Sequence, residues 1–338
     1  MDGTAREIRL VARPRGFPDE DLFELAETGI PDPGDGQLLV RNAYFSVDPY
    51  MRPRMNDVRS YVAPFTLGEA MTGGAVGRVA VSRHPKFAEG DWVLHGLGWR
   101  EWALSDGSGM RKIDATRAPV SLSLGVLGMP GFTAWWGLFE LCTPKEGETV
   151  LVSGAAGAVG SAAGQMAKIA GCRVIGSAGS DEKLAWIRDL GCDEAFDYRG
   201  QSVREALAEL APDGIDIYFD NVGGDHLEAA IGALRLHGRV AACGSISRYN
   251  DVEAAPGPRN MFMVVTKRLS IRGYIITDHY DRFPEFFAQA QEWVADGRLR
   301  YRETVVEGIE NAPQAFAGLF RGENIGKMLV KVGPDESD

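Results

Sequence analysis

Cysteine is scarce in this chain, which has only four in 338 residues. The four lie far apart, and the sequence has neither a Cys-x-x-Cys pair nor a Cys/His cluster at the spacing of a zinc site. This excludes a small scaffold held by disulfide bonds and favours buried thiols that pack as small apolar residues. We therefore expect a cytoplasmic protein. The cysteines are Cys142, Cys172, Cys192 and Cys243.

Long hydrophobic runs are also missing. The chain begins Met-Asp-Gly-Thr-Ala-Arg-Glu, without the apolar stretch of a signal peptide. The most membrane-like stretch, residues 118–139, has no charge but is interrupted by Pro119, Pro130 and four glycines. A spanning helix needs a longer and less broken apolar run. We expect a buried connector and helix at this place, and no membrane partner.

Positive charge is in short supply. Lys and Arg total 36 against 47 Asp and Glu, which gives a net charge of −11. This acidity argues against non-specific binding to nucleic acid, although a local basic pocket could still take a phosphate group. Hydrophobic residues make up 45% and charged residues 25%, the composition of an ordinary globular protein. The length corresponds to about two domains.

The first 120 residues are predicted to be rich in short strands. Residues 37–43, 73–81 and 91–96 fit strands, and Gly and Pro residues separate them. This pattern is typical of a compact barrel-like or sandwich-like unit.

Strands and helices alternate after about residue 125. We predict strands at 149–153, 172–176, 215–220 and 239–243, and helices at 158–170, 182–190 and 227–236. We also expect a strand at 269–276, an amphipathic helix at 283–295, and a final strand at 326–332 that pairs in the first domain. Such alternation builds a mostly parallel sheet through right-handed crossovers. The predicted fold class is therefore α/β.

A glycine turn lies between the strand at 149–153 and the helix that begins at Ala158. Its sequence, Ser153 to Gly160, has the pattern Gly-x-x-Gly-x-x-Gly. Glycine permits a sharp turn and a close approach of backbone N–H groups to a pyrophosphate, and the helix N-terminus adds a favourable dipole. The position of the turn after a buried strand and before a helix predicts a dinucleotide site.

The second predicted strand points to NADP rather than NAD. An NAD site usually has an acid about 20 residues after the glycine turn, where it binds the ribose 2′-hydroxyl. Here the strand runs into Gly176–Ser180, and the first acid is Asp181. The following helix carries Lys183, which could balance a 2′-phosphate. A solvated lysine paired with Glu182 or Asp181 is the alternative reading of Lys183.

The chain as a whole resembles the zinc-free branch of the medium-chain dehydrogenases/reductases, which contains alkenal double-bond reductases, prostaglandin reductases and curcumin reductases. The matching segments are Ser46–Arg52, Leu127–Ala134, Gly154–Gly160, Gly179–Lys183, Phe219–Gly224, Cys243–Asn250 and Asn324–Lys327. The resemblance implies a GroES-like, β-rich catalytic domain over 1–125, completed by 305–338. It also implies a Rossmann NADP-binding domain over 126–304, an active site in the cleft, and a homodimer joined through the Rossmann domains.

The resemblance also implies a set of cofactor contacts. Gly157, Ala158, Val159 and Gly160 would hold the pyrophosphate, and Lys183 and Tyr198 would face the 2′-phosphate. Asn221 and the loop of Cys243, Gly244, Ser245, Ile246, Ser247, Arg248 and Tyr249 would line the ribose and diphosphate path. Tyr274, Ile275, Ile276 and Asn324 would lie near the nicotinamide.

The motifs for a catalytic metal are absent from the places where zinc-dependent relatives have them. Those relatives have an early cysteine ligand and a Gly-His-Glu motif near the position of Gly68–Glu69–Ala70. Here the histidine is missing, and Cys142 is the first cysteine. We therefore expect no metal, and alcohol dehydrogenation, which needs the metal to polarise its carbonyl, is not among the leading hypotheses.

A hydride enzyme without zinc needs an acceptor that is already electrophilic, such as an α,β-unsaturated aldehyde or ketone. Hydride would add to the β-carbon, and a hydrogen-bond donor at the carbonyl oxygen would stabilise the enolate by about 3 kcal/mol. The candidate donors are Tyr50, Tyr61 and Tyr280; the ribose 2′-hydroxyl of the cofactor is an alternative. A quinone oxidoreductase is the alternative activity, and a regulatory protein that binds NADPH without turnover is the non-enzymatic alternative.

Overall fold

The computed structural model describes residues 3–336, which form two compact units. Unit 1 comprises the residues up to Gly125, the segment Glu303–Asn324 and the residues from Met328 onward. Unit 2 comprises Val126–Arg302 together with Ile325–Lys327. The domain bounds expected from the sequence stay a prediction.

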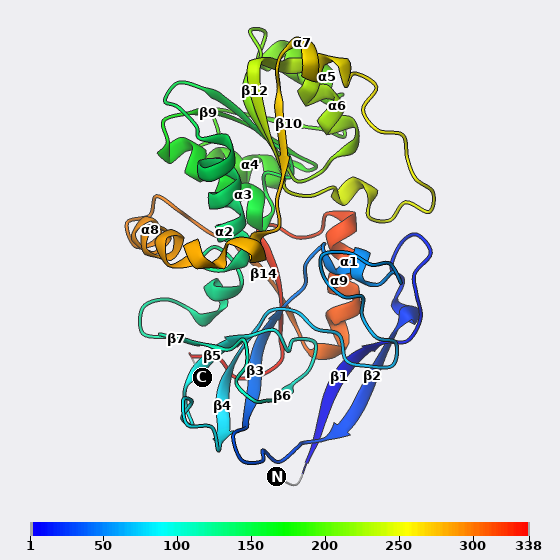
Figure 1. Ribbon diagram of the computed structural model, residues 1–338, viewed down its shortest axis with the longest axis vertical. Helices are drawn as coiled ribbons and strands as arrows, with labels where there is room; N and C mark the ends of the chain where they lie inside the picture. Colours follow the sequence, from blue (N-terminus) through cyan, green and yellow to red (C-terminus); the bar gives the residue numbers. More distant parts are fainter. Residues whose placement is uncertain (1–2, 337–338) are drawn as a thin grey trace. The chain divides into compact units, whose positions relative to one another are not determined.

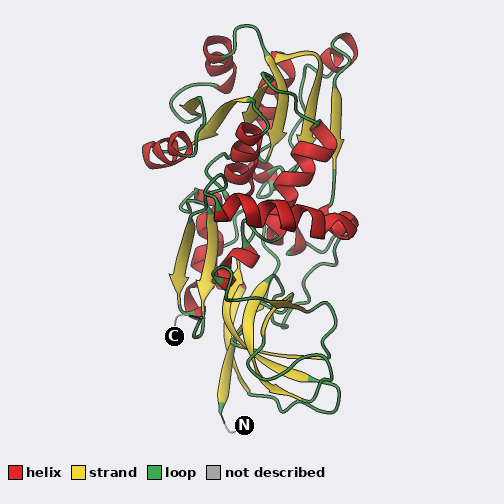
Figure 2. Cartoon of the chain, turned by 90° about the vertical axis from the view of Figure 1, so that its left-hand side faces the viewer, coloured by secondary structure: helices red, strands yellow, loops and turns green. Residues whose placement is uncertain are grey.

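Unit 1 is mainly an antiparallel β structure (Figures 1 and 2). Its larger sheet has the order β14-β15-β3-β4-β5-β7, and β6 pairs with β3. Because β15 pairs with β3, the expectation that the last strand returns to the first domain is confirmed. The strands are β1 (Thr4–Leu10), β2 (Phe23–Gly29), β3 (Leu38–Ser46), β4 (Ala75–Ser82), β5 (Trp92–His95), β6 (Trp102–Ser105), β7 (Arg111–Ile113), β14 (Glu303–Glu307) and β15 (Lys327–Lys331).

The core of unit 1 is built around Trp99, which is fully buried. Its ring stacks on Phe45 at 5.6 Å between ring centroids and meets the edge of Phe316 at 5.9 Å. A buried aromatic side chain removes about 150–250 Å² from water, so these rings dominate the packing energy. The helices of unit 1 are η1 (Glu20–Leu22), α1 (Met51–Arg54), η2 (Val120–Leu124), η6 (Ile309–Asn311) and α9 (Ala312–Arg321).

Unit 2 contains a six-stranded parallel sheet with the order β10-β9-β8-β11-β12-β13. Counted along the chain this is the order 3-2-1-4-5-6 of a Rossmann domain. The strands are β8 (Thr149–Val152), β9 (Arg173–Ala178), β10 (Glu194–Asp197), β11 (Ile215–Asp220), β12 (Leu234–Ala242) and β13 (Ser270–Gly273). The predicted α/β fold class is confirmed.

Helices cover both faces of this sheet. Figure 1 shows α3 and α4 on one side, and α5 and α6 pack on the other side against buried residues such as Leu151 and Tyr218. The helices are α2 (Met129–Trp135), the π-helical η3 (Trp136–Cys142), α3 (Ala158–Ile169), α4 (Asp181–Asp189), α5 (Val203–Leu210), α6 (Gly224–Ala233), η4 (Ile246–Arg248), α7 (Phe262–Thr266), η5 (Ile276–Arg282) and α8 (Phe283–Ala295).

Three predicted elements of unit 2 have bounds that are wrong by three residues or more: the strand expected at 269–276, the helix expected at 227–236 and the strand expected at 239–243, which begins at Leu234. The strand expected at 269–276 covers only Ser270–Gly273, because its partner β12 pairs with it only as far as Ala242, opposite Gly273. The helix expected at 227–236 ends at Ala233, and β12 begins at Leu234. Leu227, Ile231 and Leu234 continue a helical spacing of apolar residues, which hides this boundary in the sequence.

The stretch at 118–139 forms η2, α2 and the start of η3, in agreement with the predicted connector and helix. Within residues 3–336, no helix combines the length and the hydropathy that crossing a bilayer requires.

Candidate functional site

The strand order of unit 2 reverses between β8 and β11. From β8 the chain builds outward through β9 and β10, and from β11 it builds in the opposite direction through β12 and β13. The loops after β8 and β11 therefore leave the sheet in opposite directions, and ligands of such sheets bind in the crevice at the carboxyl ends of these strands. The glycine turn follows β8, and Asn221 follows β11.

The glycine turn brings the start of α3 close to the end of β8. Gly154 has φ +59°, in the region that favours glycine. A Cβ at Gly160 would lie 2.3 Å from the carbonyl oxygen of Gly154, so a side chain there would force the turn apart. Gly157 is the N-cap of α3 and has no side chain to cap it. The first N–H groups of α3 are thus available to an anion.

Two backbone hydrogen bonds hold this turn in place. The N–H of Ala155 donates to Ser177 of β9 at 3.0 Å, and the N–H of Gly326 donates to the carbonyl oxygen of Ala156 at 2.7 Å. The turn is therefore tied to the sheet on one side and to the segment before β15 on the other.

A buried polar network lies beneath the turn and centres on Asp220, the last residue of β11. Its Oδ1 accepts the Tyr218 hydroxyl at 2.7 Å and the N–H groups of Val222 and Gly223 at 3.0 and 2.7 Å. The Tyr218 hydroxyl also lies 2.9 Å from Ser153 Oγ. Burial raises the pKa of Asp220, although the donors around it act in the opposite direction.

The same network orients Asn221, which the sequence analysis assigned to the cofactor path. Its N–H donates to Ser153 Oγ at 3.0 Å, and its Nδ2 donates to the Ser153 carbonyl oxygen at 2.8 Å. Sequence analysis missed the part of Asp220 and Tyr218 in this arrangement. The available signal was an acid at the end of the strand Ile-Asp-Ile-Tyr-Phe-Asp, directly after the apolar run Ile217–Phe219.

The predicted loop from Cys243 to Tyr249 packs on the turn that follows β11. The N–H groups of Cys243 and Gly244 donate to the Asp220 carbonyl oxygen at 2.9 and 3.0 Å. Ser247 Oγ donates to the Val222 carbonyl oxygen at 2.6 Å. The loops after β8, β11 and β12 therefore lie together at one edge of the sheet. They carry Gly157–Gly160, Asn221 and Cys243–Tyr249, three of the predicted cofactor segments.

The end of β9 forms a second part of the site. Ser180 caps α4 by accepting the N–H of Lys183. Tyr198, after β10, comes so close to Gly179 that a Cβ there would lie 2.8 Å from the Tyr198 hydroxyl oxygen and 3.0 Å from Arg199 Nε. Because β10 pairs with β9, these residues converge although about 20 residues separate them in the sequence.

Two cations lie at this end of β9. Burial lowers the pKa of Lys183, and the positive charge of Arg199 lowers it further. Lys183 was predicted as a phosphate ligand, whereas Arg199 was missed. An anion between two such cations would relieve their mutual repulsion. The acid Glu182 on the same turn forms an ion pair with Arg302 at 2.7 Å.

Tyr274, Ile275 and Ile276 follow β13. The Tyr274 hydroxyl donates to the carbonyl oxygen of Thr133 at 2.8 Å, and burial raises its pKa well above the usual value. Ile276 is buried, and Ile275 is half-buried. Asn324 belongs to unit 1, so its place at the nicotinamide stays a prediction.

The candidate hydrogen-bond donors occur in both units. In unit 1, Tyr50 and Tyr61 both interact with Arg54, and Tyr50 does so through a hydrogen bond. Burial lowers the pKa of Arg54, whose guanidinium also lies 4.0 Å from the centre of the Phe65 ring. Sequence analysis did not single out Arg54. In unit 2, Tyr280 is 44% exposed and stacks on Phe132 at 5.9 Å.

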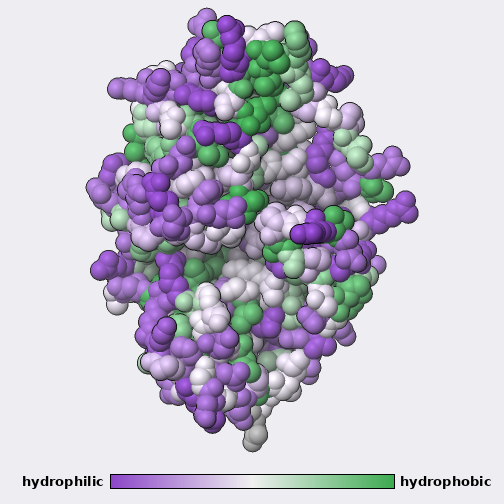
Figure 3. Space-filling model, in the orientation of Figure 1, coloured by the Kyte–Doolittle hydropathy of each residue, from purple (hydrophilic) through white to green (hydrophobic). Residues whose placement is uncertain are grey.

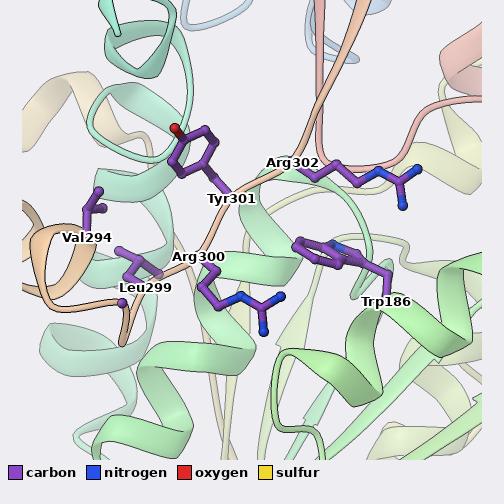
Figure 4. Close-up of a pocket in the computed structure, with 7 residues that line it drawn as sticks. Trp186, Val294, Leu299, Arg300, Tyr301 and Arg302 are labelled. Carbon is purple, nitrogen blue, oxygen red and sulfur yellow. The ribbon is translucent and has the colours of Figure 1, made fainter. Parts of the chain in front are cut away.

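A groove of about 430 Å³ lies beside α4 and α8 (Figure 4). In this view Trp186 of α4 lies between Arg300 and Arg302. Arg300 pairs with Asp189, and its backbone N–H donates to Gln165 of α3 at 2.7 Å. Arg300 thus links α3, through Gln165, to α4, through Asp189.

Across residues 3–336, no three His, Cys, Asp or Glu side chains come together in a way that could hold a metal ion.

The chain is similar in sequence to known oxidoreductases. Residues 6–113 match a family described as "N-terminal domain of oxidoreductase", and residues 158–292 match one described as "Zinc-binding dehydrogenase". The chain is 44% identical to the NADPH-dependent curcumin reductase of Escherichia coli (strain K12), over 97% of this chain and 96% of that protein. It is also 44% identical to a 2-alkenal reductase (NADP(+)-dependent) of Nicotiana tabacum, over 94% of each.

A solved structure is similar over almost the whole chain. It is the crystal structure of CurA in complex with NADPH from Vibrio vulnificus, with a TM-score of 0.93 and 44% identity, covering 97% of this chain and 99% of that chain.

The close approach at Gly160 predicts that alanine substitutions at two glycines of α3 change the stability of the protein by different amounts. We expect Gly160→Ala to lower the free energy of unfolding by about 1–3 kcal/mol, because the new Cβ meets backbone that must move. Gly164→Ala is the matched control. A Cβ there would lie 3.7 Å from Cys192 Sγ, an ordinary contact, so we expect no loss and a gain of up to about 1 kcal/mol. Urea unfolding would measure both, and equal effects would contradict the close approach.

Proposed function

Since the chain belongs to the medium-chain dehydrogenase/reductase superfamily, in the branch that contains the curcumin and 2-alkenal reductases, we propose that it is an NADPH-dependent reductase of carbon–carbon double bonds conjugated to a carbonyl group. The substrate class is α,β-unsaturated aldehydes and ketones, and hydride adds to the β-carbon. The observation that carries the proposal is the glycine turn at the switch point of the sheet, with the cations Lys183 and Arg199 at the end of β9.

The residues of unit 2 fit NADP(H). The backbone of Gly157–Gly160 leaves uncapped N–H groups at the start of α3, which suit a pyrophosphate. Gly179 and Ser180 occupy the place after β9 where NAD-binding proteins have an acid, and Ser180 is engaged as the cap of α4. Lys183, Arg199 and the hydroxyl of Tyr198 would hold the 2′-phosphate through charge-assisted hydrogen bonds.

The reaction needs a donor at the carbonyl oxygen of the substrate. When bound, NADPH supplies a hydride to the β-carbon, the π electrons move onto the carbonyl oxygen as an enolate, and a proton from solvent or a tyrosine joins the α-carbon. We propose Tyr50 as the first candidate for the donor. The guanidinium of Arg54 next to its hydroxyl makes the hydroxyl a stronger donor, because a positive charge favours the phenolate.

A homodimer joined through unit 2 is also proposed. Strand β13 is the outer strand of the parallel sheet, and its residues Arg272 and Gly273 are exposed. The neighbouring helix α7 presents Phe262 and Val265, which are 75% and 68% exposed. Figure 3 shows hydrophobic side chains gathered at the top of the view, where Figure 1 labels α7. An unpaired strand edge beside exposed apolar side chains is a typical association surface.

The activity is tested by following NADPH oxidation with trans-2-nonenal, an aryl enone and 1,2-naphthoquinone. We expect turnover of the enal and the enone, with the saturated carbonyl compound as the product. Reduction of the quinone alone would replace the proposal with a quinone oxidoreductase. Binding of NADPH without oxidation by any of the three would favour a protein that uses the nucleotide for regulation.

The cofactor preference is tested with Lys183→Ala and Arg199→Ala. Each substitution removes one of the two positive side chains proposed to bind the 2′-phosphate. We therefore expect KM for NADPH to rise about tenfold or more. KM for NADH should stay within about twofold, because NADH has no phosphate at this position. Steady-state kinetics with both coenzymes measures the ratio. A wild-type protein that prefers NADH would contradict the assignment.

The donor is tested by replacing tyrosines with phenylalanine. Tyr50→Phe should lower kcat/KM for trans-2-nonenal by about 100-fold, the usual effect of removing one donor to an oxyanion. Tyr61→Phe and Tyr280→Phe test the other two candidates. Tyr301→Phe, in the groove beside α4, is the control and should leave kcat/KM unchanged. If all three candidate variants retain wild-type kcat/KM, the tyrosine donor is wrong.

The association surface is tested with Phe262→Asp. Light scattering on the wild-type protein should give twice the 36.6 kDa mass of one chain, and the variant should shift toward the monomer because a charge opposes burial. Val58→Asp, which changes another exposed apolar residue in unit 1, is the control. A wild-type monomer would contradict the proposed dimer.

A further inference from the structure

A histidine that the reaction does not use is enclosed near the end of β9. His226 lies in the first turn of α6 and is only 7% exposed. Its Nε2 lies 3.3 Å from Oγ of Ser177, which is fully buried in β9, two residues before Gly179. Two polar side chains from different elements thus pair inside unit 2, where an unpaired polar group would be costly.

The other side of the histidine faces Tyr198. The two rings meet edge to face, with 5.3 Å between their centroids and an angle of 72° between their planes. This is a favourable aromatic geometry. Tyr198 is 39% exposed, and the backbone of Gly179 lies against its hydroxyl end. The tyrosine ring therefore lies between His226 and Gly179, and its hydroxyl and Arg199 Nε both lie close to Gly179.

His226 differs from Lys183 and Arg199 in its charge. Burial lowers its pKa to about 4, and the nearby Asp225 only partly opposes this. The ring is thus neutral at pH 7 and adds no positive charge to the phosphate end of the site. What it contributes is a fixed position, which the Ser177 hydroxyl maintains.

We propose that His226, anchored by Ser177, is a positioning residue for the 2′-phosphate of NADPH: it holds the Tyr198 hydroxyl in the direction that the phosphate requires and so contributes to the choice of NADPH over NADH. This rests on the proposed function, since it needs a bound NADPH. Glycine at 179 is part of the arrangement, because a Cβ there would displace Tyr198.

The experiment measures Kd of the full chain for NADPH and NADH by calorimetry, together with KM and kcat for the enal. His226→Ala removes the ring that supports Tyr198. We expect Kd and KM for NADPH to rise about tenfold, Kd for NADH to stay within about twofold, and kcat at saturating NADPH to stay within about twofold. His226→Phe keeps an aromatic ring against Tyr198 and should recover most of the NADPH affinity. Ser177→Ala, which releases the anchor, should raise Kd for NADPH about threefold.

A double mutant tests whether the effect passes through Tyr198. In a Tyr198→Phe background the hydroxyl that His226 orients is gone, so His226→Ala should change Kd for NADPH by less than about twofold. His84→Ala is the matched control, since His84 also packs on an aromatic ring, Phe87 at 5.1 Å, but lies in unit 1.

Three results would overturn the inference: equal loss of NADPH and NADH affinity in His226→Ala, no loss of either, or full additivity with Tyr198→Phe. If His226→Ala does not fold, His226→Phe and Ser177→Ala decide the matter, and wild-type NADPH affinity in Ser177→Ala would then count against the anchor. A wild-type chain that binds neither coenzyme would instead remove the proposed function itself.

Discussion

The buried carboxylate of Asp220 is the interaction on which the cofactor site depends. One oxygen of this side chain accepts three donors, from Tyr218, Val222 and Gly223. Its backbone oxygen accepts the N–H groups of Cys243 and Gly244. A single residue therefore connects the end of β11 to the turn that begins α6 and to the loop after β12. Each hydrogen bond to a charged group is worth about 1.5–3 kcal/mol, so together these bonds contribute substantially to holding the loops in one arrangement.

The charges near the end of β9 differ in sign from the net charge of the chain. The chain has a net charge of −11, yet the end of β9 gathers Lys183 and Arg199. Their acidic neighbour Glu182 also forms an ion pair with Arg302. A phosphate at this place would thus meet two cations although the chain as a whole is acidic. Selectivity for a phosphorylated coenzyme then arises from local geometry rather than from the overall charge.

The sequence predicts the parts of this site that depend on neighbours along the chain. The glycine turn is visible because strand, turn and helix follow one another, and the alternation of strands and helices predicts the parallel sheet. Arg199 is not visible, because its approach to Lys183 exists only once β10 pairs with β9. The start of β12 was missed because Leu234 is apolar and buried, as it would be in the helix that was predicted there. The roles of the predicted site residues stay predictions.

The tyrosines of unit 1 show why chemistry is harder to predict than cofactor binding. Tyr50 and Arg54 are four residues apart, and Tyr61, in the following loop, also acts electrostatically on the same guanidinium. That guanidinium also donates to the carbonyl oxygen of Ala63 at 3.1 Å and to Thr72 Oγ1 at 3.2 Å, so groups other than the tyrosines help to fix its position. A fixed positive charge beside a hydroxyl can strengthen a hydrogen bond as negative charge develops on a substrate oxygen. We propose that this arrangement supplies the electrostatic part of the chemistry when a conjugated carbonyl is reduced.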